Sequence, residues 1–361
     1  MKPISALITA LPGAVAQGLI WGILAIGVYI TYKILDFADL TVDGSLGTGG
    51  AVAVVLILAG CPVPIALAVA FVAGGIAGLI TGLLHTKLGI PGILAGILTQ
   101  LALYSINLDI MGQANKAINI DKYPLFVSLR YIPSTIIKSI LCVGAIAGLL
   151  YWYFGTEHGF MIRATGCNAN MARAQGINTN KATVVALLLS NGLVGLAGGL
   201  LAQYQGNADI NMGRGAIVIG LAAVIIGEVV GELLLDKHLN FIGRLLFTAV
   251  GAIVYFVVIQ IVLWMGLSTQ NTKLFSAIVV AIFLAVPYIK SSTKNSYKRA
   301  AIRGLEAQEN QGTIAVQTIE DTEDADIKSV TKSKKVQSGM TFESATKKVV
   351  KSVKKGVVED A

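Results

Sequence analysis

The chain has 361 residues, of which 55% are hydrophobic and 13% are charged, and its mean hydropathy is +0.73. A soluble domain carries roughly 25% charged residues, so this composition excludes an ordinary water-soluble protein and predicts one embedded in a lipid bilayer. The formal net charge is +8, but half of the 28 Lys and Arg residues follow residue 289, so the charge does not indicate a nucleic-acid partner.

Hydrophobic runs predict nine transmembrane helices, because a helix needs about 20 apolar residues to cross a bilayer. In chain order the predicted spans are 8–32, 44–60, 63–84, 89–107, 135–155, 183–203, 214–235, 241–265 and 273–289. The second and seventh are rich in glycine, so we expect some helices to be broken or re-entrant. The first span is expected to be retained rather than cleaved as a signal peptide. The predicted fold class is therefore an all-α polytopic membrane protein.

A change in composition after the ninth span predicts two domains. Residues 1–289 form a transmembrane domain, and residues 290–361 form a cytoplasmic, polar, basic tail. This tail is expected to be largely disordered, because it has too few apolar residues to form a core. Apolar residues at helical spacing between residues 342 and 358 leave two interpretations open: a solvated tail, or a basic amphipathic helix on the membrane surface.

The positions of Lys and Arg predict the orientation, because positive residues concentrate in cytoplasmic loops. Lys33, Lys87, Arg163 and Lys290 fall on one side when the N-terminus is outside and the C-terminus inside. The loop at 108–134 departs from this pattern, since it would lie outside and yet carries three basic residues. We expect a multi-pass protein of the cytoplasmic (inner) membrane in this orientation.

Two short segments resemble each other at an offset of 170 residues: Ala38–Gly44 reads ADLTVDG, and Ala208–Arg214 reads ADINMGR. The predicted crossings place them on opposite sides of the membrane, as in the inverted repeats that build a transport pathway at the bilayer midplane. A chance match is the alternative. The pathway residues predicted from this match are Asp39, Thr41, Asp43, Ser45, Asn207, Asp209 and Asn211.

The acidic residues in these segments have a second interpretation. Charged groups inside a membrane are costly and usually functional. The same carboxylates would be ordinary helix caps if they lay in the headgroup zone, with Asp43 as the N-cap of the second span. Both interpretations stay open from the sequence alone.

The most specific segment is Arg163–Asn180, between the fifth and sixth spans on the predicted cytoplasmic side. Asn168 is suited to cap a helix N-terminus, residues 169–175 favour about two helical turns, and Gly176 suits the left-handed position after a helix. A helix of this length is not stable alone, so we expect it to lie in a groove of a cytoplasmic partner. The residues assigned to this contact are Arg163, Gly166, Asn168, Asn170, Met171, Ala172, Arg173, Ala174, Gly176 and Asn178.

This segment resembles the coupling loop of ABC-importer permeases of the branched-chain amino acid and ribose type. The resemblance extends over about residues 10–289, and together its motifs are closest to the subgroup assigned to tryptophan/tyrosine transport. The further motifs that carry it are Phe37–Ser45, Leu84–Leu88, Leu94–Thr99, Ala102–Leu108 and Gly220–Glu228. Arg214 departs from the subgroup, in which an apolar residue is expected, and the long basic tail is atypical.

The resemblance implies the partners and the mechanism. Two permease copies would form a homodimer in the lipid bilayer, two ABC ATPase subunits would bind ATP and Mg²⁺ below, and an extracellular substrate-binding (lipo)protein would deliver solute above. The chain has no Walker A pattern, so hydrolysis would belong to the ATPase and this subunit would not be an enzyme. The resemblance implies that the solute is a small molecule moved by alternating access, and the subgroup implies that it is an amino acid, an aromatic one in particular.

Three other classes of membrane protein are alternatives to an importer subunit. An ion-coupled secondary transporter also shows inverted repeats, but it needs no cytoplasmic docking helix. A channel needs a repeated filter sequence, and an enzyme needs a catalytic cluster. The three cysteines are far apart and the three histidines lie in loops or at span ends, so no catalytic residue and no metal site is predicted.

Overall fold

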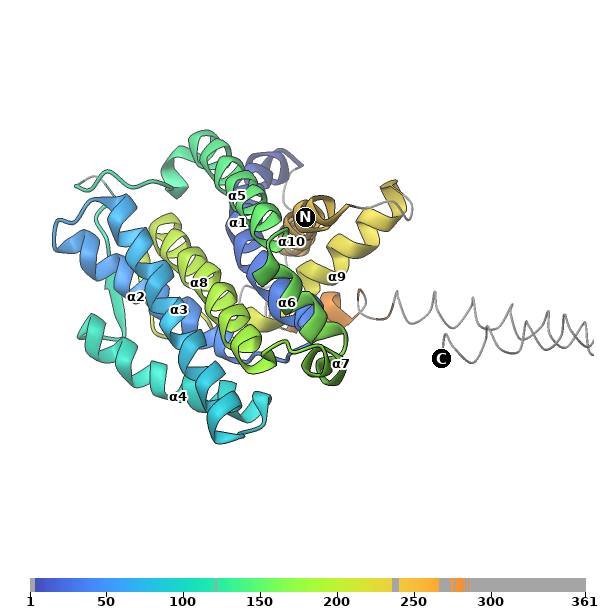
Figure 1. Ribbon diagram of the computed structural model, residues 1–361. Coiled ribbons are helices and arrows are strands. Elements are labelled where there is room, and N and C mark those ends of the chain that lie inside the picture. Colours follow the sequence, from blue (N-terminus) through green and yellow to red (C-terminus); the bar gives the residue numbers. More distant parts are fainter. Residues whose placement is uncertain are drawn as a thin grey trace, which may run out of the picture. The chain divides into compact units, whose positions relative to one another are not determined.

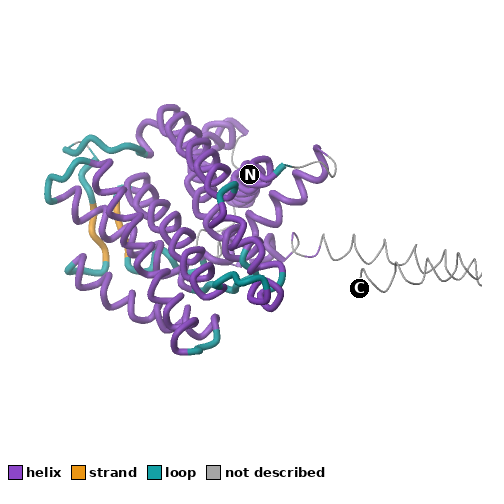
Figure 2. Tube along the Cα trace, in the orientation of Figure 1, coloured by secondary structure: helices purple, strands orange, loops and turns teal. Residues whose placement is uncertain are grey.

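The computed structural model describes residues 4–120, 122–235 and 240–265, followed by residues 274, 275, 277–281, 283 and 285. Figures 1 and 2 show a bundle of helices with one pair of short strands. In chain order the elements are α1 (Ile4–Tyr29), the π-helical η1 (Ile30–Ile34), α2 (Thr41–Leu58), α3 (Val63–Leu88), α4 (Gly92–Met111), β1 (Asn115–Ala117), η2 (Leu129–Tyr131), α5 (Ile132–Phe154), α6 (Glu157–Cys167), α7 (Ala169–Ala174), α8 (Thr179–Gln205), β2 (Asn207–Asp209), α9 (Ala216–Leu235) and α10 (Phe241–Trp264).

Eight of the described helices are long and apolar enough to cross a membrane, which confirms the all-α polytopic fold. They correspond to the first eight predicted spans. Of the ninth, 273–289, only part is described, and its described positions between 274 and 285 are helical. The predicted tail, 290–361, lies outside the described residues.

The second and seventh spans differ from the expectation of broken helices. Both α2 and α9 are continuous, with 18 and 20 residues. Their glycines serve helix packing instead of breaking the helices, because backbone groups in lipid have no water to bond and stay paired within a helix. The irregular backbone lies before these helices, in residues 35–40 and 206–215.

Close backbone contacts between helix pairs, among them α3–α8, α1–α10, α2–α8 and α9–α10, hold the bundle together. Gly74 of α3 faces the Asn191 carbonyl of α8, at a place where a Cβ atom would overlap that oxygen. Similarly, Gly18 of α1 lies against the backbone of Ile253 in α10. Small residues allow such close approach in membrane helices, and the gain is van der Waals packing over the length of the pair.

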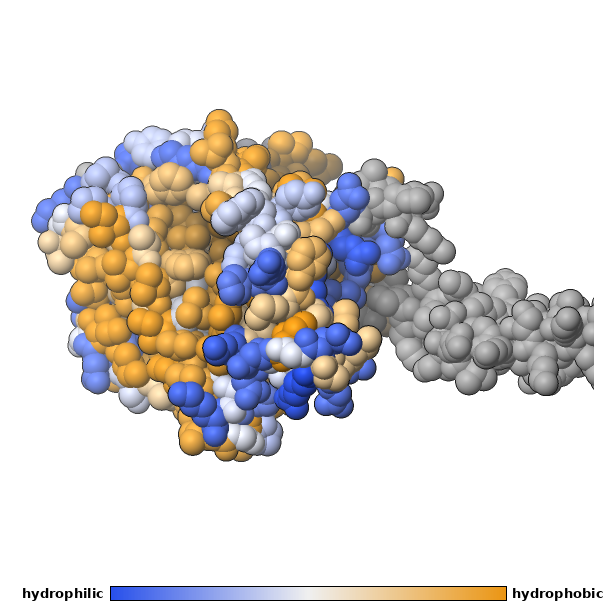
Figure 3. Space-filling model, in the orientation of Figure 1, coloured by the Kyte–Doolittle hydropathy of each residue, from blue (hydrophilic) through white to orange (hydrophobic). Residues whose placement is uncertain are grey.

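The surface separates into apolar and polar regions. Large hydrophobic side chains are exposed along α3, α4 and α5, whereas most of α1, α2 and α8 is buried. Figure 3 shows hydrophobic residues over the face formed by α3 and α4, and hydrophilic residues gathered around α6 and α7. An exposed apolar surface of this kind belongs against lipid or a second protein.

We expect Gly74→Ala to destabilise the protein, because the added methyl group would displace α8 from α3. Overpacking of this kind costs about 1–3 kcal/mol, so the apparent melting temperature in detergent should fall by several degrees. Gly148→Ala on α5 is the matched control, since no atom lies within 4 Å of its Cβ position. Equal melting temperatures for the two variants would show that the α3–α8 contact yields easily.

Candidate functional site

A buried polar network joins the start of α2 to the middle of α8. Asp39 is 2% exposed, and its Oδ1 accepts the Thr41 N–H at 2.9 Å. Its Oδ2 accepts from Asn191 Nδ2 at 2.6 Å. The Ser45 hydroxyl donates to Asn191 Oδ1 at 2.7 Å. Two of the predicted pathway residues, Asp39 and Ser45, therefore meet at the amide of Asn191, which the sequence analysis did not single out, and Thr41 joins them through Asp39.

Three threonines extend this network to α3 and α4. The Thr81 hydroxyl lies 2.7 Å from Thr41 Oγ1 and 2.9 Å from Thr99 Oγ1, and all three side chains are buried. In the described part of the chain, no Lys, Arg or His forms an ion pair with Asp39. A buried carboxylate is stabilised here by hydrogen bonds alone, so each of these bonds matters for keeping the group inside the bundle.

The network lies well inside the bundle, away from its ends. Asn191 follows the first residue of α8 by 12 positions, which corresponds to about 18 Å of helix. Leu40 and Thr41 lie beside Gly96, one turn into α4. The non-helical segment 35–40 therefore enters the bundle, and irregular backbone at such depth survives only where protein groups satisfy it.

Asp43 is not the N-cap of α2, which was one of the two interpretations of the sequence, and its pathway role stays a prediction. The N-cap residue of α2 is Leu40, and Asp43 lies in the first turn of that helix. Its carboxylate instead accepts the N–H groups of Gly215 and Ile217, each at 2.9 Å, and so stabilises the start of α9. The N-cap interpretation is wrong because Asp43 accepts the N–H groups at the start of α9, which follows it by more than 170 residues in the sequence.

The remaining predicted pathway residues form a separate group at the end of α8. Asp209 Oδ1 accepts the Asn211 N–H at 2.7 Å, and its Oδ2 accepts from Asn115 Nδ2 at 3.3 Å. Asn207 pairs with Ala117 in the antiparallel register of β1 and β2. Among the described residues, no hydrogen bond joins this group to Asp39, Thr41 or Ser45, so the seven predicted residues do not form one site.

The short helix predicted in Arg163–Asn180 is confirmed as α7, and its cytoplasmic location stays a prediction. Asn168 Oδ1 accepts the Met171 N–H at 2.9 Å, which caps the first turn. Gly176 has a φ of +82°, its N–H donates to the Arg173 carbonyl, and the Ile177 N–H donates to the Ala172 carbonyl. Both bonds of a Schellman motif are present, so the helix is closed at both ends.

The residues of this segment divide into an exposed face and anchors. Met171 is 64% exposed, and Asn170 and Ala174 are exposed beside it, whereas Ala172 is buried. Arg173 Nε donates to Thr179 Oγ1 at 2.8 Å, and Asn178 Oδ1 accepts the Lys181 N–H at the start of α8. The exposed face is thus held firmly against the beginning of α8.

Helix α6, which the sequence analysis missed, anchors the other side. The Gly166 backbone lies against the Ile34 carbonyl of η1. The Arg163 guanidinium lies 4.4 Å from the centre of the Phe241 ring of α10. A cavity of about 560 Å³ lies between the turn from α3 to α4 and the segment from Arg173 to Asn180. Among the described residues, no cluster of His, Cys, Asp and Glu is arranged to hold a metal ion.

Comparison with known proteins gives a family and several relatives. A model of the family described as branched-chain amino acid transport system / permease component matches residues 11–287. A tyrosine transport system permease protein of Clostridioides difficile is 37% identical over 284 residues, which cover 78% of this chain and 92% of that protein. An uncharacterized protein of Rickettsia prowazekii is 35% identical over 75% of this chain and 95% of that protein.

More distant similarity reaches permeases of other solutes. A galactofuranose transporter permease protein of Escherichia coli is 27% identical over 69% of this chain and 71% of that protein. No solved structure matches the chain. The resemblance inferred from the loop and the motifs around it is therefore confirmed, and the chain belongs to the branched-chain amino acid transport system permease family of ABC transporters.

Proposed function

We propose that this chain is the permease subunit of an ATP-driven importer that moves a small solute across the cytoplasmic membrane by alternating access. The observation that carries the proposal is α7, a helix of six residues capped at both ends and exposed at Met171. A short closed helix on a polar face is suited to dock on a partner. The partner would be an ABC ATPase that binds ATP and Mg²⁺.

Contacts from α7 lead directly into the bundle. Helix α6, which precedes α7, lies against Ile34 of η1. From η1 the chain continues into the segment that carries Asp39, and Lys33 of η1 forms an ion pair of 2.9 Å with Glu228 of α9. A displacement of α7 would therefore reach both α2 and α9. ATP biases the conformation only through such differential contacts.

An internal repeat supports the proposed pathway. The offset of 170 residues that relates Asp39 to Asp209 also brings α1, α2 and α3 into approximate register with α8, α9 and α10. Asp39 and Asp209 each accept the N–H two residues later, so both segments form the same turn. Helix α3 packs on α8 as α10 packs on α1. With the predicted orientation the two halves would be inverted.

The assembly and cargo follow from the family and the relatives. We propose a permease homodimer, an extracellular substrate-binding (lipo)protein, an N-terminus outside and a C-terminus inside. The tyrosine transport permease from Clostridioides difficile favours an amino acid as cargo, and an aromatic one in particular. Asp39 is buried and has no Lys, Arg or His as an ion-pair partner among the described residues, which favours an ion-coupled secondary transporter as the second candidate, because buried carboxylates bind coupling ions. The exposed α7, which such a carrier does not need, favours the importer.

Gly176→Val should uncouple the transporter. A β-branched residue in the left-handed region costs about 1–2 kcal/mol, which shifts the equilibrium between the closed and the open helix end roughly tenfold toward the open form. We expect solute-stimulated ATPase activity and uptake to fall about tenfold in the complex that co-purifies with this subunit, while membrane insertion is retained.

Gly60→Val is the matched control for this experiment. Gly60 has a φ of +88° and open space around it, as Gly176 has, but it lies in the turn after α2. The control should keep coupling. If the Gly176 variant transports as well as the control, or if no ATPase accompanies the wild-type protein, the importer proposal fails.

An exchange between Asp39 and Asn191 separates a structural role from a pathway role. Asp39→Asn should lower the melting temperature, because two amide donors then face each other. Adding Asn191→Asp restores a donor opposite an acceptor and should recover most of the loss, about 1–3 kcal/mol. We expect the double variant to be stable and still impaired in uptake, since the carboxylate has moved to α8. Normal uptake by the double variant would remove Asp39 from the pathway.

A further inference from the structure

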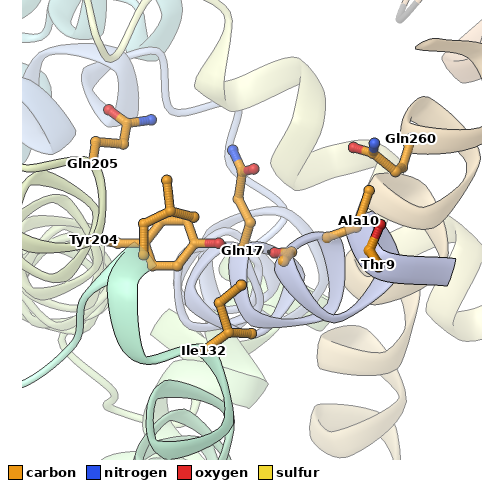
Figure 4. Close-up of a pocket in the computed structure, with 10 residues that line it drawn as sticks. Thr9, Ala10, Gln17, Ile132, Tyr204, Gln205 and Gln260 are labelled. Carbon is orange, nitrogen blue, oxygen red and sulfur yellow. Dashed lines mark hydrogen bonds between the residues drawn. The ribbon is translucent and has the colours of Figure 1, made fainter. Parts of the chain in front are cut away.

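A second cavity lies at the end of the bundle opposite α7. It has a volume of about 350 Å³, near the lower end of the range for small-molecule sites. It is enclosed by the first turns of α1, the start of α5, the end of α8 and the last turns of α10 (Figure 4). Its lining residues are Thr9, Ala10, Gly13, Ala14, Gln17, Leu129, Ile132, Tyr204, Gln205 and Gln260.

Three glutamines from three different helices give this cavity its chemistry. Figure 4 shows the side chains of Gln17, Gln205 and Gln260 around one space, with the Tyr204 ring beside them. None of the three amides forms a hydrogen bond with another described residue. Gln17 and Gln260 are half-buried within the apolar helices α1 and α10, and Gln205 is exposed at the end of α8.

The Tyr204 ring, which forms the aromatic wall beside these amides, is fixed in place. Tyr204 is 3% exposed, and its hydroxyl donates to the Gly13 carbonyl at 3.0 Å. This bond joins the end of α8 to the start of α1. The aromatic ring is therefore held in position, so the cavity is a preformed space with one aromatic wall.

The lining contains no charged side chain. An amide both donates and accepts hydrogen bonds, so several amides suit a molecule with donors and acceptors and no net charge. A free α-amino acid fits this description, because its carboxylate takes amide N–H groups and its ammonium group gives protons to amide oxygens.

We propose that this cavity is an outer binding site for a net-neutral, zwitterionic molecule of amino-acid size, an inference that rests on the proposed import function. The site lies within a single subunit. Helix α8 runs from the cytoplasmic α7 to the cavity over 27 residues, about 40 Å. The cavity therefore faces the side from which an importer receives its solute.

The test measures binding of radiolabelled L-tyrosine to the full-length permease in nanodiscs, without an ATPase. Gln17→Leu and Gln260→Leu should each weaken binding about tenfold, the effect of losing a hydrogen bond to a charged group. Ala10→Phe should abolish binding by filling the cavity. Gln100→Leu is the matched control, because Gln100 is a half-buried amide on α4 outside the lining, and it should bind as wild type does.

A zwitterionic lipid headgroup has the same chemistry as an amino acid, so nanodiscs with and without phosphatidylethanolamine form the second arm. Competition by L-leucine but not by L-lysine, L-glutamate or this lipid supports the proposal. Displacement of L-tyrosine by the lipid, preference for a charged amino acid, or no binding to wild type overturns it. A failure of this binding test does not count against coupling through α7. The two are separable because Gly176→Val, which should uncouple the transporter, should still bind L-tyrosine as wild type does.

Discussion

The bond between Asp39 and Asn191 is the interaction on which the interior depends. A non-helical segment enters the bundle at residues 35–40, with Leu35 and Asp39 buried and Asp36 and Ala38 exposed. The carboxylate takes the Thr41 N–H on one side and the Asn191 amide on the other, so one residue both starts α2 and ties it to α8.

Close helix packing explains how the bundle remains firm around the non-helical segment 35–40. The α3–α8 and α1–α10 pairs are in backbone contact, whereas α4 and α5 expose most of their surface. The starts of α2 and α9 are joined to each other through Asp43 and to η1 through the linker and Glu228, while α2 also packs on α8, and α9 on α10, by close backbone contact. Rigid pairs that rock about such a junction are the usual basis of alternating access.

Features that depend on residues close in sequence were predicted better than features that depend on tertiary contacts. Hydropathy located the first eight spans, and cap residues located α7, because both depend on neighbours within a few positions. Glycine content misled the interpretation of α2 and α9, since a glycine that breaks a helix and one that admits a neighbour look alike in sequence. Asn191 was visible as an amide within an apolar run, but its partner was not. The cavity at Gln17 and Gln260 was missed because its amides come from three distant helices.

Helix α8 carries all three candidate sites in a fixed order. Asn178 and Thr179 bind its start to the α7 segment, Asn191 lies at the middle in the Asp39 network, and Tyr204 closes the cavity at its end. The helix is continuous over this length, so a rotation imposed at α7 would turn the amide of Asn191 and the wall of the cavity together. A flexible element would absorb that motion within a turn or two. Under the proposed function, the continuity of α8 would therefore let a partner docked at α7 act on the cavity about 40 Å away.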